Sequence, residues 1–241
     1  MHPADNAARE ILANLEATYQ PTHEYVRVRP EDFRHLDLGF YRRTASLLSA
    51  HGFKLLADLE DRTITNAPGT VLSPVLVRVL LSRDGTVTAA LYHPHIRRFW
   101  MRALLWLLRK LPGRVTDMET ECSDGSFVAT SNASMAAALA DAPMINAEYL
   151  PARTAPVEVY ARHTQRLAEH LAARPGVTPN VLRTHDDVLA SQNRMNALKA
   201  AYRGELGMVT REELERLSMV GRQTAHDVHD AIVREQQRRA G

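Results

Sequence analysis

The sequence has little cysteine, with Cys122 as the one thiol in 241 residues. A single cysteine cannot form a disulfide within the chain, and it cannot supply the thiolates of a zinc cage. Because disulfides stabilise mainly secreted domains, this scarcity favours a reducing, cytoplasmic setting. Acids surround Cys122 at Glu119, Glu121 and Asp124, and negative neighbours disfavour the reactive thiolate. We therefore expect a buried hairpin residue rather than a nucleophile.

Long apolar runs are missing as well. No segment reaches the ~18 to 20 consecutive apolar residues of a membrane-spanning helix. The N-terminal stretch MHPADNAAREILANLEATYQ carries acids and amides, where a signal peptide has a basic start followed by an apolar stretch. We expect neither a spanning helix nor secretion through a cleavable signal.

The net charge is small, because 30 lysines and arginines stand against 28 acids and leave a formal charge of +2. Non-specific nucleic-acid affinity grows with the number of phosphates neutralised, so nucleic acid is not an expected partner. The sequence also lacks a glycine-rich phosphate loop, a GxSxG segment and a strand face that mixes aromatic with basic residues. No reaction is indicated by a motif, and we expect no cofactor.

The spacing of apolar residues changes along the chain, from a helical period to a strand period. Apolar residues recur at helical spacing over 4–18 and 33–50, and alternating segments follow. Asp84-Gly85 and Asp124-Gly125 suit the tight turns of two hairpins. The predicted strands are KLLADLEDRTIT, VLVRVLLS, DGTVTAALY, VTDMETECS and SFVATSN. These segments predict four to five antiparallel strands.

Helical spacing returns after Pro156, over 157–174, 185–203 and 211–219. Thr184 with Asp187, and Thr210 with Glu213, form capping-box-like starts for the last two. The sequence therefore predicts an α+β fold in which an antiparallel sheet of about four to five strands is flanked by helices. We expect an α+β core over 1–155 and a helical C-terminal region over 156–241 that packs on the core or extends from it.

The most distinctive segment is HIRRFWMRALLWLLRKLPGR, which holds both tryptophans. As a helix over 96–111 it would be about 24 Å long at ~1.5 Å per residue, shorter than the ~30 Å hydrocarbon core, and Arg102 would lie near its middle. These two features exclude a membrane span. The apolar face of this helix would contain Ile96, Phe99, Trp100, Ala103, Leu104, Leu107, Leu108 and Leu111.

Two interpretations of this basic amphipathic helix stay open. The helix could cover the sheet formed by the flanking hairpins, or it could bind an anionic membrane surface or a protein partner. Met101, Leu105 and Trp106 widen the apolar sector beyond the stripe that one sheet needs. The predicted membrane- or partner-binding residues are Arg98, Phe99, Trp100, Met101, Arg102, Leu104, Leu105, Trp106, Arg109 and Lys110. We expect a protein partner or self-association, and a cytoplasmic protein that can also lie at the inner face of the membrane.

Histidines supply a rival interpretation. His93 and His95 alternate at the end of a predicted strand, and His226, His229 and Asp230 share one face of the terminal helix. Such side chains can bind a transition metal, but the HExxH spacing of zinc hydrolases is absent. A metal-dependent hydrolase that uses His93, His95 and the C-terminal residues is the alternative function.

One resemblance is carried by the second hairpin. A TxxxDGxxVxTSN-like segment contains Thr120, Asp124, Gly125, Val128, Thr130, Ser131 and Asn132. It resembles a segment of uncharacterised bacterial proteins, which implies a bacterial α+β protein and no particular activity. From the residues themselves we expect a non-enzymatic binding or interaction protein, with peripheral membrane association through helix 96–111 as its finer form.

Overall fold

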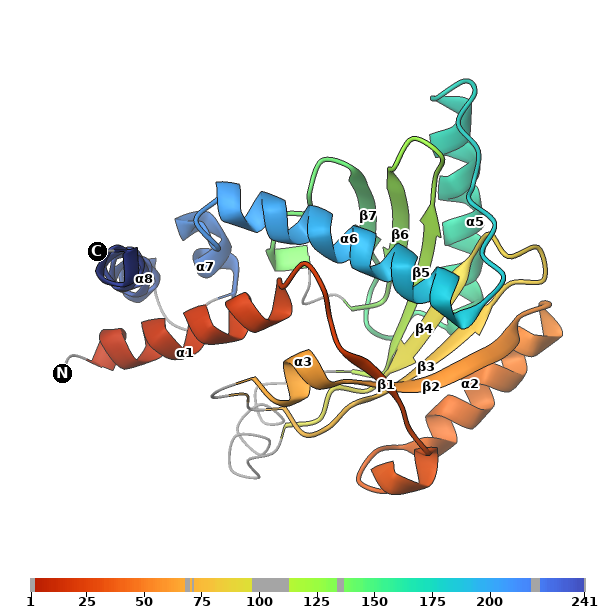
Figure 1. Cartoon of the computed structure of the whole chain (residues 1–241), viewed down its shortest axis with the longest axis horizontal. Helices are drawn as coiled ribbons and strands as arrows, with labels where there is room; N and C mark the ends of the chain where they lie inside the picture. The colour runs from red at the N-terminus through yellow and green to blue at the C-terminus, as the bar shows by residue number, and fades with distance from the viewer. Residues whose placement is uncertain are drawn as a thin grey trace.

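The computed structural model of the chain describes residues 3–67, 70, 72–96, 113–133, 137–217 and 222–240. These residues form one seven-stranded sheet with helices around it (Figure 1). The predicted α+β class is confirmed. The predicted count of four to five strands is too low.

The strands lie across the sheet in the order in which they occur along the chain. They are β1 (Tyr25–Arg27), β2 (Lys54–Asp61), β3 (Leu76–Leu81), β4 (Thr88–Tyr92), β5 (Val115–Glu121), β6 (Phe127–Ser131) and β7 (Ile145–Tyr149). Each pair of neighbours is antiparallel except β6 and β7, which are parallel.

The two strands that the sequence pattern did not predict, β1 and β7, form the edges of the sheet. β1 is only three residues long, too short for an alternation to be recognised. β7 lies between Pro143 and Pro151, and nearby prolines disfavour the prediction of a strand. The prolines flank this strand without interrupting it, so its backbone remains able to pair with β6.

Both predicted hairpin turns are present. Gly85 and Gly125 adopt φ values of 76° and 78°, a conformation that glycine reaches at no steric cost. At Gly85 the backbone also passes close to a second segment, because a Cβ there would lie 2.3 Å from the carbonyl oxygen of Leu182. The Leu182 N–H donates to the Gly85 carbonyl at 2.8 Å. This turn therefore anchors the segment that leads into the next helix.

The helices are α1 (Pro3–Thr18), α2 (Leu38–Ala50), α3 (Arg62–Thr65), α5 (Pro156–Ala172), α6 (His185–Glu205), α7 (Arg211–Leu217) and α8 (Arg222–Ala240), with a short 3-10 turn over Pro30–Phe33. Two predicted boundaries change. The helix expected from residue 33 begins at Leu38, because Asp37 accepts a capping bond from the Phe40 N–H. The strand expected over 54–65 ends at Asp61, whose carboxylate caps α3.

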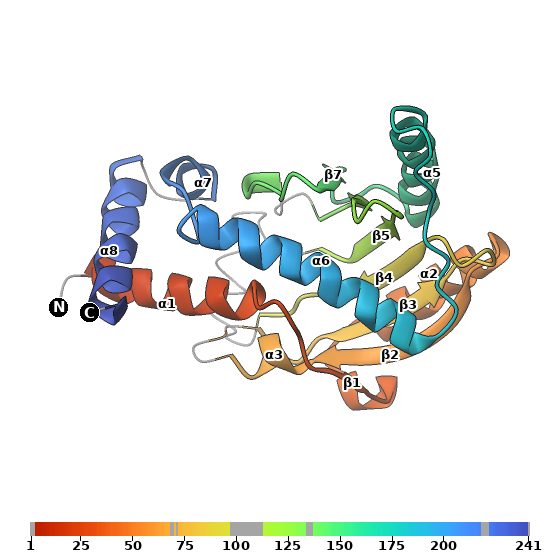
Figure 2. The same cartoon turned by 45° about the horizontal axis from the view of Figure 1, so that its top comes forward.

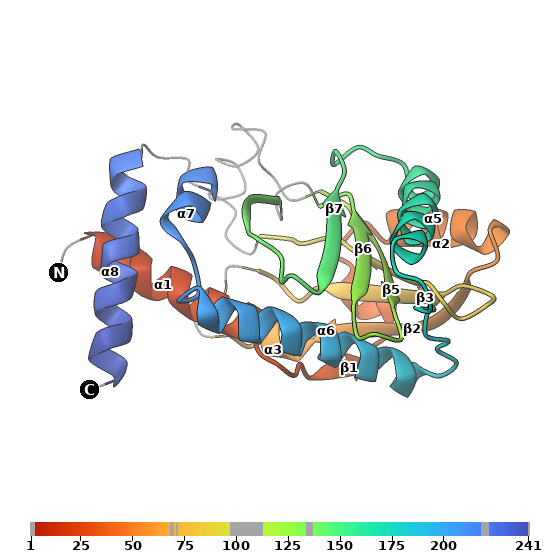
Figure 3. The same ribbon diagram turned by 90° about the horizontal axis from the view of Figure 1, so that it is seen from above.

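The sheet is covered on both faces, as Figures 2 and 3 show. The two-residue period of the strands turns Leu76, Leu80 and Met118 toward α2 and α5, where they join one buried cluster. It turns Val77 and Val79 to the opposite face, where they pack with Val188 and Leu189 of α6. Helix α6 thus lies on one face, and α2 and α5 lie on the other.

The two ends of the chain meet beside the sheet. Helix α1 crosses α8, and α7 packs against α8 (Figure 3). Their shared buried cluster contains Ala8, Leu12, Val209, Leu214, Ala225, Val228, Ala231 and Ile232. These three helices extend the molecule beyond the end of α6.

Candidate functional site

A cavity of about 410 Å³ lies between α6 and the sheet, and we call it the α6 cavity. Its size falls within the range of small-molecule pockets, roughly 300 to 1,000 Å³. The sheet lines it with Leu59, Val77, Val79, Thr88, Ala90, Tyr92, Asp117, Glu119 and Tyr149. Helix α6 lines it with Val188, Leu189, Gln192, Asn196, Lys199 and Arg203. The stretch from the end of α1 to β1 adds Thr18, Tyr19, His23 and Tyr25, and Asp61 and Asp141 are also among the lining residues.

The period of each element explains this lining. Side chains two residues apart on a strand share a face, so Asp117 and Glu119 of β5 point to the same side as Ala90 of β4. Residues three or four apart on a helix share a face, which brings Asn196 and Lys199 to the sheet side of α6. The sheet and α6 therefore each supply both apolar and polar side chains to the cavity.

Three carboxyl groups gather at the polar end of the α6 cavity. The Tyr92 hydroxyl donates to Asp117 Oδ2 at 2.7 Å, and the Tyr149 hydroxyl donates to Asp141 Oδ1 at 2.9 Å. Glu119 lies two residues from Asp117 on β5. A smaller hollow of about 130 Å³ is lined by all five of these residues as well. The polar end of the α6 cavity therefore also forms part of the wall of the smaller hollow.

Glu119 differs from the two aspartates, because its carboxyl group forms no hydrogen bond with any described residue. Burial raises its pKa to about 7, with Asp117 adding to the rise and Lys199 opposing it. Burial also raises the pKa of Asp117 and of Asp141. The protein therefore holds Glu119 close to the midpoint of its titration at neutral pH.

A histidine lies in the wall formed by the segment before β1. His23 Nδ1 lies 2.6 Å from Asp61 Oδ2, and the His23 side chain is only 4% exposed. Its Nε2 is buried and has no hydrogen-bond partner within the described structure. The ring stacks on Tyr25, with the ring centroids 5.9 Å apart. If Nδ1–H donates to Asp61, Nε2 carries a lone pair that can accept a hydrogen bond.

The predicted interaction surface over 98–110 lies outside the described residues, so binding of a membrane or partner there stays a prediction. Ile96, the first residue of the predicted helix 96–111, is described; it is buried and forms an isolated antiparallel bridge with Leu72. None of the helices formed by the described residues is long and apolar enough to cross a membrane.

Cys122 is buried, as predicted.

The metal candidates other than His93 have polar neighbours. His95 Nδ1 lies 3.1 Å from the Ser73 hydroxyl. Burial lowers the pKa of His93, whose Nδ1 is buried and has no hydrogen-bond partner among the described residues. On α8, His226 Nε2 lies 2.6 Å from Glu215. His229 and Asp230 both contact Arg211. No three metal-binding side chains gather within the described ranges, so the hydrolase alternative gains no support from them.

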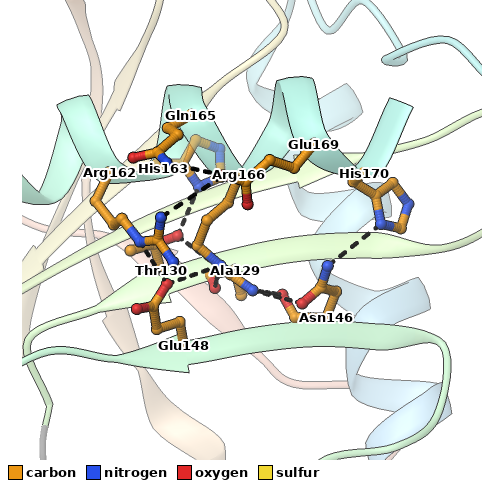
Figure 4. Close-up of polar contacts among 10 residues, drawn as sticks. All are labelled: Ala129, Thr130, Asn146, Glu148, Arg162, His163, Gln165, Arg166, Glu169 and His170. Atoms are coloured by element: carbon orange, nitrogen blue, oxygen red, sulfur yellow. Dashed lines mark hydrogen bonds and ion pairs between the residues drawn. The ribbon is translucent and has the colours of Figure 1, made fainter. Parts of the chain in front are cut away.

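A second polar cluster lies beneath α5, on the other face of the sheet (Figure 4). Arg166 donates to the Thr130 hydroxyl at 2.7 Å and to the Asn146 carbonyl at 2.8 Å, and it also donates to the Ala129 carbonyl. His163 lies between the hydroxyls of Thr120 and Thr130. These groups satisfy one another across a packed interface. The cluster therefore holds α5 on the sheet.

His163 should make the fold sensitive to acid. Burial, with Arg166 adding to it, lowers the pKa of His163 to about 3, whereas an unfolded histidine titrates near 6.5. The unfolded chain therefore binds the proton first, and stability falls as the pH drops below about 6.5. We expect His163 to cost about 2 kcal/mol of unfolding free energy at pH 5 relative to pH 7.5.

Urea unfolding at pH 7.5, 6 and 5 measures this effect. His163→Gln keeps a group able to bond with Thr120 but cannot be protonated, so its stability should change less over this range than that of the unmodified protein. His51→Gln, which alters an exposed histidine on the C-cap of α2, is the matched control and should keep the original pH dependence. An unchanged slope in His163→Gln would show that His163 does not control the acid response.

Comparison with known proteins adds no relative. The chain matches no family model, no curated protein and no solved structure. Its function must therefore be inferred from the chemistry of its own residues.

Proposed function

We propose that this protein binds a small, mainly apolar molecule in the α6 cavity. The observation that carries the proposal is a cavity of about 410 Å³ in which Glu119 and His23 Nε2 have no hydrogen-bond partner among the described residues. Protein interiors are close-packed, and their buried polar groups are nearly always paired. A large space that keeps unpaired polar groups is therefore costly to the fold, and binding of a ligand would offset that cost.

The lining also suggests which part of a ligand lies where. Leu59, Val77 and Val79 on the sheet face Val188 and Leu189 of α6 at one end, and the carboxyl groups lie at the other. Ligand pockets commonly combine apolar walls with a few polar groups that fix orientation. The arrangement suits a ligand with an apolar body and one polar group.

Binding is favoured over nucleophilic catalysis. A catalytic histidine of that kind is hydrogen-bonded to the hydroxyl or thiol that it activates. In the described part of the chain, His23 Nε2 has no such neighbour, and the thiol of Cys122 does not line the cavity. These observations support binding over catalysis by an activated nucleophile.

Fluorescence of N-phenyl-1-naphthylamine, an uncharged apolar dye that brightens in apolar surroundings, tests the proposal. We expect saturable binding at one site. Ala90→Trp should abolish it, because Ala90 projects from β4 into the cavity and the indole would fill the space. Leu47→Trp adds the same ring on the exposed side of α2, where Leu47 is 49% exposed, and should leave binding unchanged.

The same experiment can disprove the proposal. If the folded protein does not bind the dye, or if Ala90→Trp binds it as well as Leu47→Trp does, the α6 cavity is not a ligand site. Circular dichroism shows whether Ala90→Trp folds. Val79→Phe, a smaller increase in volume at a neighbouring position of the same wall, provides a second cavity-filling variant.

A further inference from the structure

Among the described residues that line the α6 cavity, the acids outnumber the cations that have no acidic partner. Arg203 already pairs with Glu213 at 2.8 Å, and Asp61 already has His23 Nδ1 at 2.6 Å. Among the described residues of the polar end, Lys199 is the lysine or arginine without such a partner. It faces three carboxyl groups, those of Asp117, Glu119 and Asp141, so acids are in excess.

We propose that the bound molecule is an apolar amine, whose ammonium group is held where Asp117, Glu119 and Asp141 line the polar end of the α6 cavity. This inference rests on the proposed function, because it names the class of ligand for the same cavity. The apolar part of the amine would lie against Leu59, Val77, Val79, Val188 and Leu189.

The hydrogen-bonding capacity of the acids fits an ammonium group. An ammonium ion donates three hydrogen bonds, and an ionised carboxylate can accept about four. Asp117 and Asp141 each accept one from a tyrosine hydroxyl and retain further acceptor sites. Glu119 accepts none from the described residues. A charge-assisted bond to such acceptors contributes more than a neutral one.

The surroundings favour a cation over other polar groups. A carboxylate or phosphate on the ligand would be repelled by the acids of the polar end, where Lys199 and the already paired Arg203 are the described cations. The rings of Tyr92 and Tyr149 also line the polar end, and tyrosine faces attract cations. An alcohol could bond to the acids, but it would leave their excess charge uncompensated.

Proton release should accompany binding of an amine. Near neutral pH Glu119 is protonated in about half of the molecules, since its pKa is about 7. An ammonium group beside it favours the ionised form, so the affinity for the amine should rise from pH 5.5 to pH 8. The affinity for an uncharged ligand of the same shape should not rise in this way.

Displacement of N-phenyl-1-naphthylamine by three compounds of similar shape tests the inference at pH 7.5. These are 2-phenylethylamine, 2-phenylethanol and 3-phenylpropanoate, which are cationic, neutral and anionic. We expect the amine to bind at least about tenfold more tightly than the alcohol, as one charge-assisted hydrogen bond would give, and the propanoate to bind most weakly. Direct calorimetric titration with 2-phenylethylamine checks each affinity without the dye.

Glu119→Gln should reduce the preference for the amine over the alcohol by about tenfold while the dye still binds. Glu31→Gln, which removes an exposed acid from the 3-10 turn before α2, is the matched control and should keep the preference. Asp141→Asn, at the other side of the polar end, should act in the same direction as Glu119→Gln.

Two kinds of failure are distinguishable. If the dye binds but the alcohol or the propanoate competes as well as the amine does, the ligand is not an amine and the proposed function still stands. If neither the dye nor 2-phenylethylamine binds to the folded protein, the proposed function is wrong and the inference fails with it.

Discussion

Removing the Glu213 side chain, as in Glu213→Ala, is expected to lower the free energy of unfolding by about 3 to 5 kcal/mol, the cost of leaving a buried charge unpaired. Arg203 of α6 and Glu213 of α7 lie 2.8 Å apart, and their side chains are 2% and 1% exposed. Glu213 also accepts from the backbone N–H groups of Ala140 and Thr210. Its loss would leave the charge of Arg203 without its acidic partner and both backbone N–H groups without this acceptor.

The pair joins four parts of the molecule. Arg203 also donates to the carbonyl of Ala140, which lies between β6 and β7, and its guanidinium lies 5.1 Å from the centre of the Tyr19 ring. It therefore connects α6, α7, the segment before β7 and the residue that follows α1. A loss of stability here should loosen one end of the α6 cavity as well.

Urea unfolding of Glu213→Ala measures the cost, and Arg211→Ala provides a control of similar chemistry. Arg211 and Asp230 lie 2.6 Å apart but are 50% and 48% exposed, so breaking their pair should cost under about 1 kcal/mol. The double variant Arg203→Met with Glu213→Leu should recover much of the loss, because no buried charge remains. Equal effects of Glu213→Ala and Arg211→Ala would contradict the assigned importance of burial.

The sequence correctly predicted the helix start and the hairpin turns, because these depend on residues that are close together in the chain. The capping box of Thr210 and Glu213 is present, with the Thr210 N–H donating to the Glu213 carboxylate and the Glu213 N–H donating to the threonine hydroxyl. The two Asp-Gly turns are also present. What these signals could not show is that Arg203 lies beside Glu213, since that contact depends on how α6 packs against α7.

The edge strands illustrate the same limit. Tyr25 of β1 pairs with Asp61 of β2, and the residues between them include α2. A three-residue segment carries too few positions to reveal this pairing. Its position in the sheet depends on contacts that are distant in sequence, which periodicity does not record.

Part of the candidate site could have been inferred from one strand. On β5, Asp117 and Glu119 alternate with Thr116, Met118 and Thr120, and all three of these are buried. Alternation places the two acids together on the opposite face. No sequence signal showed that α6 covers that face. The remaining members, His23 and Lys199, could be assigned to the cavity only once the packing of α6 was known.

Glu119→Gln is expected to raise the free energy of unfolding by about 3 kcal/mol at pH 8. The pKa of Glu119 is about 7 in the fold and 4.5 as its ordinary value, and each unit of difference corresponds to about 1.36 kcal/mol. The raised pKa means that the unfolded chain releases its proton first. Stability is therefore lost as the pH rises from about 4.5 through 7, and glutamine avoids this loss because it does not ionise.

Urea unfolding at pH 8 and pH 4.5 measures the gain, which should shrink at the lower pH because Glu119 is then mostly protonated in the fold. Glu31→Gln serves again as the control, since an exposed carboxyl should change stability by less than about 0.5 kcal/mol at either pH. A variant less stable than the unmodified protein at pH 8 would show that the ionised Glu119 supports the fold.

The sign of this effect bears directly on function. Residues that destabilise the fold and cluster in a cavity are typical of binding sites, where stability is sacrificed for recognition. If Glu119→Gln is more stable and also loses its preference for 2-phenylethylamine, the same carboxyl group both weakens the empty fold and recognises the ligand. An amine that binds to the ionised form would then restore stability with the logarithm of its concentration, by about 2.7 kcal/mol at a hundredfold excess over Kd. The unmodified protein should therefore gain more thermal stability from the amine than Glu119→Gln does.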